Sequence, residues 1–304
     1  MGDSLSITYR GMTMNRNPNP FILRVWRQGE DQPGEFVACG SAIYLGQRYA
    51  LTCWHVIVGD PKSTSHGDAQ KWVAAFHYQV TTDLSAAGAT SQPNGTQAAE
   101  GPPRTTPTGA EESHVLTARV TRVVAESPRG QLDLALLELE QELPVEGLRL
   151  LDSVNQTFID DLPFCDELYA CGYACRTDVA CPTQDSIQPE HLDRIRIESD
   201  RLLDLQLIQG GVVHGYSGGA LVCGRNNKKA CLAINWLGGE TAATSRFTTS
   251  DVMIERFLRP AIGDSYEQFV MPAKDWMPSH DEVYAGLLDT YRRWVRDRWG
   301  SDFV

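Results

Sequence analysis

The sequence predicts an all-β protein built from two similar β units, and three observations support this. From Phe21 onward, short β-rich stretches alternate with Gly, Pro or Asn, as in a chain of strands and turns. Long helical periodicity is absent until close to the end of the chain. The 304 residues are enough for one large or two medium domains, and 42% of them are apolar, the ordinary globular range.

The expected strands fall into two groups of six. The first group covers residues 21–26, 35–44, 49–53, 71–80, 115–124 and 134–139. After a connecting stretch rich in Asp and Pro, the second group covers residues 167–173, 194–199, 203–208, 220–223, 230–236 and 245–248. We therefore expect an N-terminal tail over 1–20, a first β unit over 21–145 and a second β unit over 146–258.

An insertion interrupts the first β unit between Asp83 and Ser113. This stretch consists mostly of Ala, Gly, Pro, Ser, Thr, Gln and Glu, and Leu84 is its only large apolar residue. Such a composition buries too little surface to offset the entropy lost on ordering the chain. The sequence therefore predicts a disordered loop over 83–113.

The chain ends in a helical extension, expected over 259–304. One helix face collects the apolar residues Val283, Leu287, Tyr291, Trp294 and Val295. Ser279 and Glu282 form a capping box at its start, and Gly300 ends it. The arginines 292, 293, 296 and 298 would form a solvated basic face. We expect this helix to pack on the β body, and the alternative is a helix that binds a partner protein.

Charge and hydropathy restrict the classes of partner. The 39 acidic and 27 basic side chains give a net charge of −12, which disfavours nucleic acid and anionic membranes as partners. No apolar run approaches the roughly 20 residues that cross a bilayer, and residues 1–20 lack the apolar core of a signal peptide. The sequence predicts a cytoplasmic protein.

The eight cysteines are too sparse for a disulfide scaffold, and without a secretory signal we expect reduced thiols. Four of them lie close together, namely Cys165, Cys171, Cys175 and Cys181, but their spacing gives no paired C-x-x-C site of the structural zinc type. We expect free cysteines and no metal site.

The first of three segments that could carry chemistry is Gly215–Val222, GYSGGALV, in which Ser217 is flanked by glycines. Glycines allow turns that expose a serine and direct backbone N–H groups at one point. The N–H groups of Gly215 and Ser217 would then form an oxyanion hole, in which one donor contributes about 3–4 kcal/mol.

The other two segments supply a base and a carboxylate. In Leu51–Val56, LTCWHV, an expected strand leads into His55, whose ordinary pKa suits proton transfer near neutral pH. In the segment DLALLEL, Asp133 precedes an apolar strand, and a buried carboxylate needs a partner such as an imidazole N–H.

The three motifs follow one another in the order His55, Asp133 and Ser217, and in this the chain resembles the chymotrypsin/trypsin-like serine peptidases. Within that family it looks most like the non-secreted, bacterial-type members. The resemblance covers roughly residues 21–258. It implies two six-stranded antiparallel β-barrels with the site between them. It also implies a serine endopeptidase that acts on protein or peptide substrates through an acyl-enzyme and needs no cofactor.

The chain departs from this family's pattern near the serine. Tyr216 stands where digestive members carry the aspartate that receives the new N-terminus after zymogen cleavage, so activation by that ion pair is not expected. Gly211 stands where trypsin carries the acidic residue that selects basic substrates, and Val212 follows it. The resemblance therefore implies a pocket that takes an apolar or small substrate residue, with His214 near the entrance of that pocket. By the same resemblance, Asn235, Trp236 and Leu237 would align an extended substrate, although Trp236 fits a core position equally well.

Two other functions are compatible with the motifs. The segment around Ser217 also fits G-x-S-x-G, the nucleophile elbow of α/β-hydrolase esterases, which requires a helix directly after the serine and a later histidine. His280 is the only later histidine, and it lies in the tail. A peptidase fold that has lost activity and serves as a binding module is the remaining alternative.

Overall fold

The computed structural model describes residues 17, 19–29, 35–59, 65, 67–84, 115–128, 131–154, 165–173, 182–188, 192–198, 201–207, 216–237, 245–276 and 280–299. Most of the expected tail and nearly all of the expected loop over 83–113 lie outside these residues. Asp83 is described, and it is the last residue of a strand.

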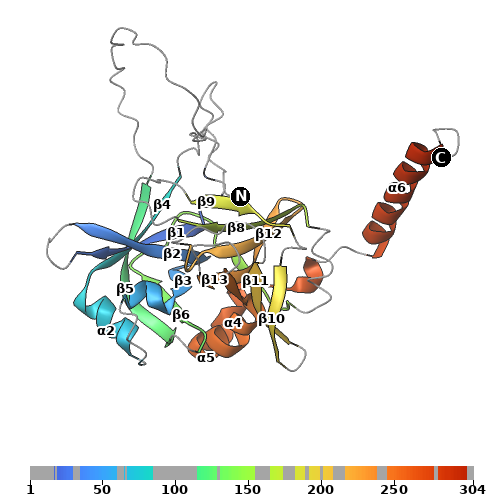
Figure 1. The fold of residues 1–304 in the computed structure, drawn as a ribbon. Coiled ribbons are helices and arrows are strands. Elements are labelled where there is room, and N and C mark those ends of the chain that lie inside the picture. The colour runs from blue at the N-terminus through green and yellow to red at the C-terminus, as the bar shows by residue number, and fades with distance from the viewer. Residues whose placement is uncertain are drawn as a thin grey trace, which may run out of the picture.

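The first β unit is a closed antiparallel barrel of six strands (Figure 1). Its strands are β1 (Ile22–Gln28), β2 (Phe36–Gly46), β3 (Tyr49–Cys53), β4 (Tyr78–Asp83), β5 (Val115–Ser127) and β6 (Leu134–Leu139). They close in the order β1-β2-β3-β6-β5-β4. The predicted first barrel is confirmed.

One strand prediction in this barrel was wrong. Residues 71–80 were expected to form a single strand, but Asp68–Ala75 form helix α2 and β4 begins only at Tyr78. Ala69 and Val73 are buried at helical spacing, i and i+4, while residues 70, 71, 74 and 75 are exposed. The Glu126 carboxylate accepts the N–H of Ala69 at 2.9 Å, which stabilises the start of the helix.

The second β unit is an open, nine-stranded sheet. Its strands are β7 (Arg149–Leu151), β8 (Glu167–Gly172), β9 (Thr183–Ser186), β10 (Leu192–Glu198), β11 (Arg201–Leu207), β12 (Ala220–Arg225), β13 (Lys228–Leu237), β14 (Arg246–Thr249) and β15 (Val270–Met271). The main path runs β10-β11-β14-β13-β12-β8-β9, and β7 pairs with β13 and β15. The described strands therefore do not confirm a second closed barrel. The sequence also missed β7, β9 and β15, which are short.

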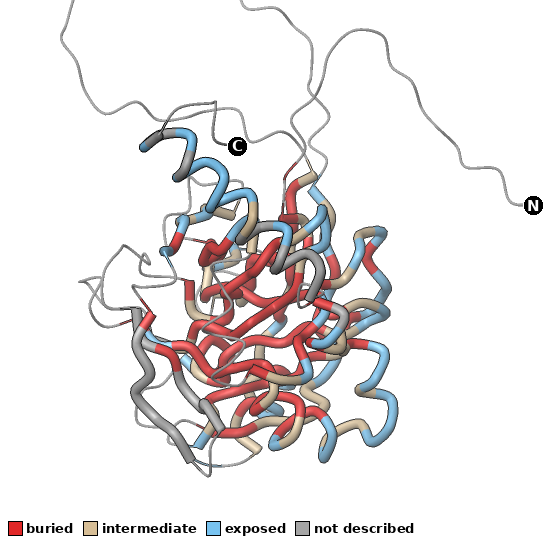
Figure 2. Tube along the Cα trace, turned by 90° about the vertical axis from the view of Figure 1, so that its right-hand side faces the viewer, coloured by how far each residue is buried: buried red, intermediate tan, exposed pale blue. Residues whose placement is uncertain are grey.

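A continuous apolar core holds the two β units together, as the buried segments running through the body in Figure 2 illustrate. Ile22, Leu51 and Leu136 from the barrel belong to the same buried cluster as Val222 and Ile234 from the open sheet, and each of the five is fully buried. Because packed interiors resist small displacements, this shared core fixes the barrel relative to the open sheet.

Short helical segments follow β14 and complete this core. They are α4 (Ser250–Met253), the π-helical turn η4 (Ile254–Leu258), α5 (Arg259–Ile262) and the 3₁₀ turns η5 (Gly263–Phe269) and η6 (Ala273–Asp275). Met253, Phe257 and Phe269 are buried in the cluster shared by both β units. These segments, rather than the last helix, cover the β body.

The last helix, α6 (His280–Trp299), projects away from the body (Figure 1). The expectation that it packs on the β body was therefore wrong. Within the described part of the chain, no helix combines the length and the apolar character that a membrane-crossing segment requires.

Candidate active site

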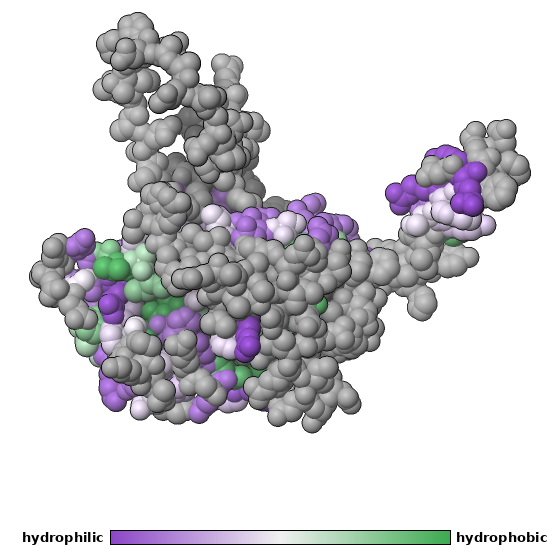
Figure 3. Space-filling view, viewed as in Figure 1, coloured by the Kyte–Doolittle hydropathy of each residue, from purple (hydrophilic) through white to green (hydrophobic). Residues whose placement is uncertain are grey.

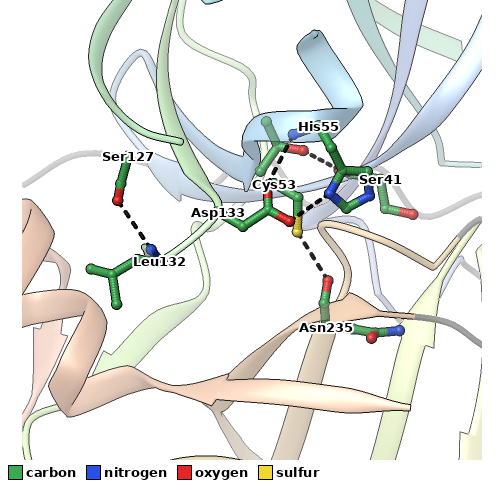
Figure 4. Close-up of polar contacts among 8 residues, drawn as sticks. Ser41, Cys53, His55, Ser127, Leu132, Asp133 and Asn235 are labelled. Atoms are coloured by element: carbon green, nitrogen blue, oxygen red, sulfur yellow. Dashed lines mark hydrogen bonds and ion pairs between the residues drawn. The ribbon is translucent and has the colours of Figure 1, made fainter. Parts of the chain in front are cut away.

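His55 and Asp133 form a hydrogen-bonded pair. His55 Nδ1 lies 2.7 Å from Asp133 Oδ2, and the His55 backbone N–H donates to Asp133 Oδ1 at 3.1 Å (Figure 4). The Asp133 side chain is 6% exposed and that of His55 is 26% exposed. The carboxylate is thus buried against an imidazole that still reaches solvent, as the sequence predicted.

The local chain path brings these two residues together. β3 pairs with β6 with Cys53 opposite Leu134, so the residues just beyond this pair, Trp54 and Asp133, are neighbours too. The Trp54 N–H donates to the Asp133 carbonyl at 3.0 Å, and His55 follows in the short helix α1 (Trp54–Ile57). Asp133 adopts a left-handed backbone with φ of 53°, which Asp and Asn tolerate better than other side chains.

Ser217 lies at the start of the open sheet, in the turn formed by residues 216–219 before β12, called the serine turn below. Its carbonyl accepts the Ser41 N–H of β2 at 2.8 Å, which ties the serine turn to the barrel. A Cβ on Gly40 would lie 2.8 Å from the Val56 side chain and 3.0 Å from the Ser217 carbonyl. The serine backbone therefore sits beside the residue that follows His55. No hydrogen bond joins the Ser217 hydroxyl to the His55 ring among the described residues.

Gly218 is required by the serine turn. Its φ is +84°, and a Cβ there would lie 1.9 Å from the Ser41 carbonyl and 2.5 Å from Thr52 Oγ1. The absence of a side chain thus lets the serine turn press directly against β2 and β3.

We expect Gly218→Ala to destabilise the fold by more than the roughly 1–3 kcal/mol of backbone strain alone, because the methyl group also collides with β2. Gly46→Ala is the matched control, since Gly46 has a φ of +108° but nothing within 4 Å of an added Cβ. Urea denaturation of both variants measures the difference in the free energy of unfolding. Equal losses in the two variants would show that the close approach of Gly218 to β2 has no energetic consequence.

Tyr216 anchors the residue before the serine. It is 1% exposed, and its hydroxyl is hydrogen-bonded to Thr183 of β9. Burial raises the pKa of the Tyr216 hydroxyl, so this group stays neutral. A neutral hydrogen bond to β9 therefore holds the residue before the serine.

Cys53 links β3 of the barrel to the open sheet. Its thiol donates to the Asn235 carbonyl at 3.1 Å (Figure 4). Burial raises the pKa of the Cys53 thiol, and the charge of Asp133 raises that pKa further, so the thiol stays protonated and can donate. The same Asn235 carbonyl accepts the Gly218 N–H at 2.8 Å, and the Asn235 N–H donates to Gly219 at 2.8 Å. Asn235 thus holds the serine turn with its own main chain.

The predicted substrate-binding residues are only partly covered. Gly211, Val212, His214 and the oxyanion-hole residue Gly215 lie outside the described residues. Trp236 is half-buried, with the Arg246 guanidinium 5.8 Å from its ring centre. The pairing of β13 with β12 ends at Ile234, whereas its pairing with β14 continues to Leu237. The backbone of residues 236 and 237 therefore extends beyond the last partner on the β12 side.

Sequence reasoning missed Gly40, Ser41 and Cys53 as parts of this site. Ser41 contacts the serine turn through its N–H, and its carbonyl accepts the Thr52 hydroxyl at 2.6 Å. A glycine and a serine in the middle of an otherwise apolar strand were the available signal, because a strand interior disfavours glycine unless another backbone approaches closely.

The structure after Ser217 bears on the esterase alternative. Ala220–Arg225 form strand β12, and Asn226 and Asn227 turn the chain into β13 with φ values of 51° and 63°. A nucleophile elbow leads from a strand into a helix. The described geometry therefore disfavours an α/β-hydrolase.

No disulfide bond is formed by the described cysteines, namely Cys39, Cys53, Cys165, Cys171, Cys223 and Cys231. Cys175 and Cys181 lie outside the described residues. Within the described part of the chain, no three His, Cys, Asp or Glu side chains are grouped so that they could hold a metal ion.

Among the described cysteines 165, 171, 223 and 231, Cys165 is expected to be the most reactive. A hydrogen bond from the Cys223 thiol lowers the pKa of Cys165 to about 7, whereas burial raises the pKa of Cys223. Iodoacetamide at pH 8 should alkylate Cys165 before Cys223, and alkylation should slow as the pH falls below about 7 and the thiolate is protonated. Peptide mapping after timed labelling measures this order. Equal labelling of both cysteines would contradict it.

No protein-family model matches the sequence, and a comparison with curated protein sequences gives no similar protein. Function is therefore inferred from this chain's own residues and geometry.

Proposed function

We propose that the protein is a serine endopeptidase that uses His55 as general base, Asp133 as its orienting carboxylate and Ser217 as nucleophile. The observation that carries the proposal is the pair of hydrogen bonds from His55 to the buried Asp133 carboxylate. A structural histidine needs no such two-point attachment to a buried acid, whereas a general base needs a fixed tautomer and a fixed orientation.

The tautomer follows from the geometry of this pair. An ionised carboxylate only accepts hydrogen bonds, so His55 carries its proton on Nδ1 and directs it to Asp133. The other ring nitrogen, Nε2, is then left with a free lone pair. That nitrogen can accept a proton from a serine hydroxyl at neutral pH.

The proposed reaction has two halves. Nε2 of His55 takes the proton of the Ser217 hydroxyl as Oγ attacks the scissile carbonyl, and the N–H groups of Gly215 and Ser217 stabilise the oxyanion. His55 then gives that proton to the leaving amine, and an acyl-enzyme remains on Ser217. Water, deprotonated by His55, attacks the ester, releases the acid product and restores the serine. This sequence needs no metal or organic cofactor.

We further propose that a peptide substrate lies extended against residues 236 and 237. Asn235 uses its N–H and carbonyl within the protein, and among the described residues β12 supplies no partner to the backbone beyond it, which is where an incoming strand would pair. Pairing of this kind binds the substrate main chain whatever its sequence. Gly211 and Val212 supply no acidic group, which favours an apolar or small residue beside the cleaved bond.

The proposal is tested by incubating the full chain with a complex peptide mixture and identifying new termini by mass spectrometry. We expect cleavage within peptides after apolar or small residues, and none with Ser217→Ala. Cleavage of simple esters alone would indicate an esterase. A folded protein without any hydrolysis would support the inactive binding module.

A further inference from the structure

The described residues of helix α6 are mostly hydrophilic or near-neutral in hydropathy in Figure 3, and exposed aromatic side chains are among them. Among the described residues, four large apolar side chains are exposed, and two of them are Tyr291 at 62% and Trp294 at 53% on this helix. Their rings stack with centroids 6.2 Å apart, and the Arg298 guanidinium lies 5.9 Å from the Trp294 ring centre. Clustered exposed aromatics on a projecting helix mark an interaction surface.

In the sequence, apolar residues recur at helical spacing on either side of Tyr291. Val283 and Leu287 occupy positions two turns and one turn before Tyr291, and Val295 occupies the position one turn after it. A helix of 20 residues is about 30 Å long, so the stripe runs over most of that length.

Charge is distributed unevenly along α6. The first half carries Asp281, Glu282 and Asp289, whereas the second half carries four arginines, namely Arg292, Arg293, Arg296 and Arg298, together with Asp297. The helix thus holds four acidic and four basic side chains and has no net charge from them. Its two halves have opposite signs.

We infer that α6 pairs with α6 of a second copy of this chain in antiparallel orientation. Antiparallel pairing places the acidic first half of each helix beside the arginines of the other, and it brings the two aromatic stripes face to face. A parallel pair would instead place arginines beside arginines. Attraction to an anionic membrane or to nucleic acid is weaker, because the helix has no net charge and the whole chain carries −12.

Sedimentation velocity of the full chain over a range of concentrations tests the pairing. We expect a dimer that dissociates on dilution. The double variant Tyr291→Ala with Trp294→Ala should stay monomeric at every concentration, and alanine preserves the helix. A wild-type chain that is monomeric throughout, or a dimer that survives the double variant, would overturn the inference.

A charge-exchange experiment tests whether the opposite charges of the two helix halves hold the pair together. One variant carries Arg292→Glu, Arg293→Glu and Arg296→Glu, and a second carries Asp281→Lys, Glu282→Lys and Asp289→Lys. Each alone should be monomeric because like charges face one another, whereas an equimolar mixture should form heterodimers. Lys228→Glu, an exposed site on β13, is the control and should dimerise like the wild type.

Two outcomes, one from the charge variants and one from sedimentation with vesicles, would contradict self-pairing of α6. One is a mixture that stays monomeric while circular dichroism shows both variants helical. The other is a monomeric wild-type chain that sediments with vesicles of phosphatidylserine, which would assign the helix to a membrane surface. Neither outcome depends on hydrolysis, so the pairing and the proposed function are tested separately.

Discussion

Replacement of His55 by alanine is expected to lower kcat for peptide hydrolysis by roughly 10⁶-fold, the scale on which loss of the base disables a serine triad. Without the imidazole, no group accepts the proton of the Ser217 hydroxyl, and an un-ionised hydroxyl is a weak nucleophile. Single-turnover and steady-state assays on one cleaved peptide measure the loss.

His77→Ala is the matched control for this variant. His77 lies on the same barrel, is exposed and contacts Arg119 rather than any residue of the site. We expect its turnover to match the wild type. Equal activity of the His55 and His77 variants would remove His55 from catalysis.

Asp133→Asn is expected to lower kcat by about 10⁴-fold while the fold is retained. Asn tolerates the left-handed backbone at this position, and its carbonyl oxygen can replace Oδ1 as acceptor of the His55 N–H. The amide NH₂ then faces Nδ1 and donates to it, so the ring proton moves to Nε2. That tautomer cannot accept a proton from Ser217.

Thermal unfolding and steady-state kinetics of the Asp133→Asn variant are measured together. A folded variant with strongly reduced kcat supports the tautomer argument. A folded variant with near-normal turnover would remove Asp133 from the triad.

The sequence predicted the strands best where apolar alternation and turn residues coincide. The hairpin from β12 to β13 is an example, with Asn226 and Asn227 at its turn. Residues 71–80 were misassigned because the apolar residues of α2 resemble a short buried strand, and only tertiary bonds such as that to Glu126 select the helix. Closure of a barrel depends on pairing between distant strands, which local patterns do not encode, so the two-barrel expectation came from the family resemblance, and the described strands confirm closure only for the first β unit.

The sequence could single out the candidate residues His55, Asp133 and Ser217 because each stands in a short motif. The contacts that hold them could not be predicted, because they join segments far apart in the sequence. Ser41 meets the turn of Ser217 across 176 positions of chain, and Cys53 meets Asn235 across 182 positions. Likewise, the amphipathic pattern predicted α6 but could not show whether its aromatic face meets the body or solvent.

Labelling with a fluorophosphonate, followed by intact mass and peptide mapping, tests the central claim most directly, because only a serine activated by its base reacts rapidly. We predict one adduct on Ser217 of the wild-type chain, no adduct on Ser217→Ala, and labelling of His55→Ala slowed by orders of magnitude. A folded wild-type protein that remains unlabelled, or one labelled at another residue, would contradict a triad of His55, Asp133 and Ser217.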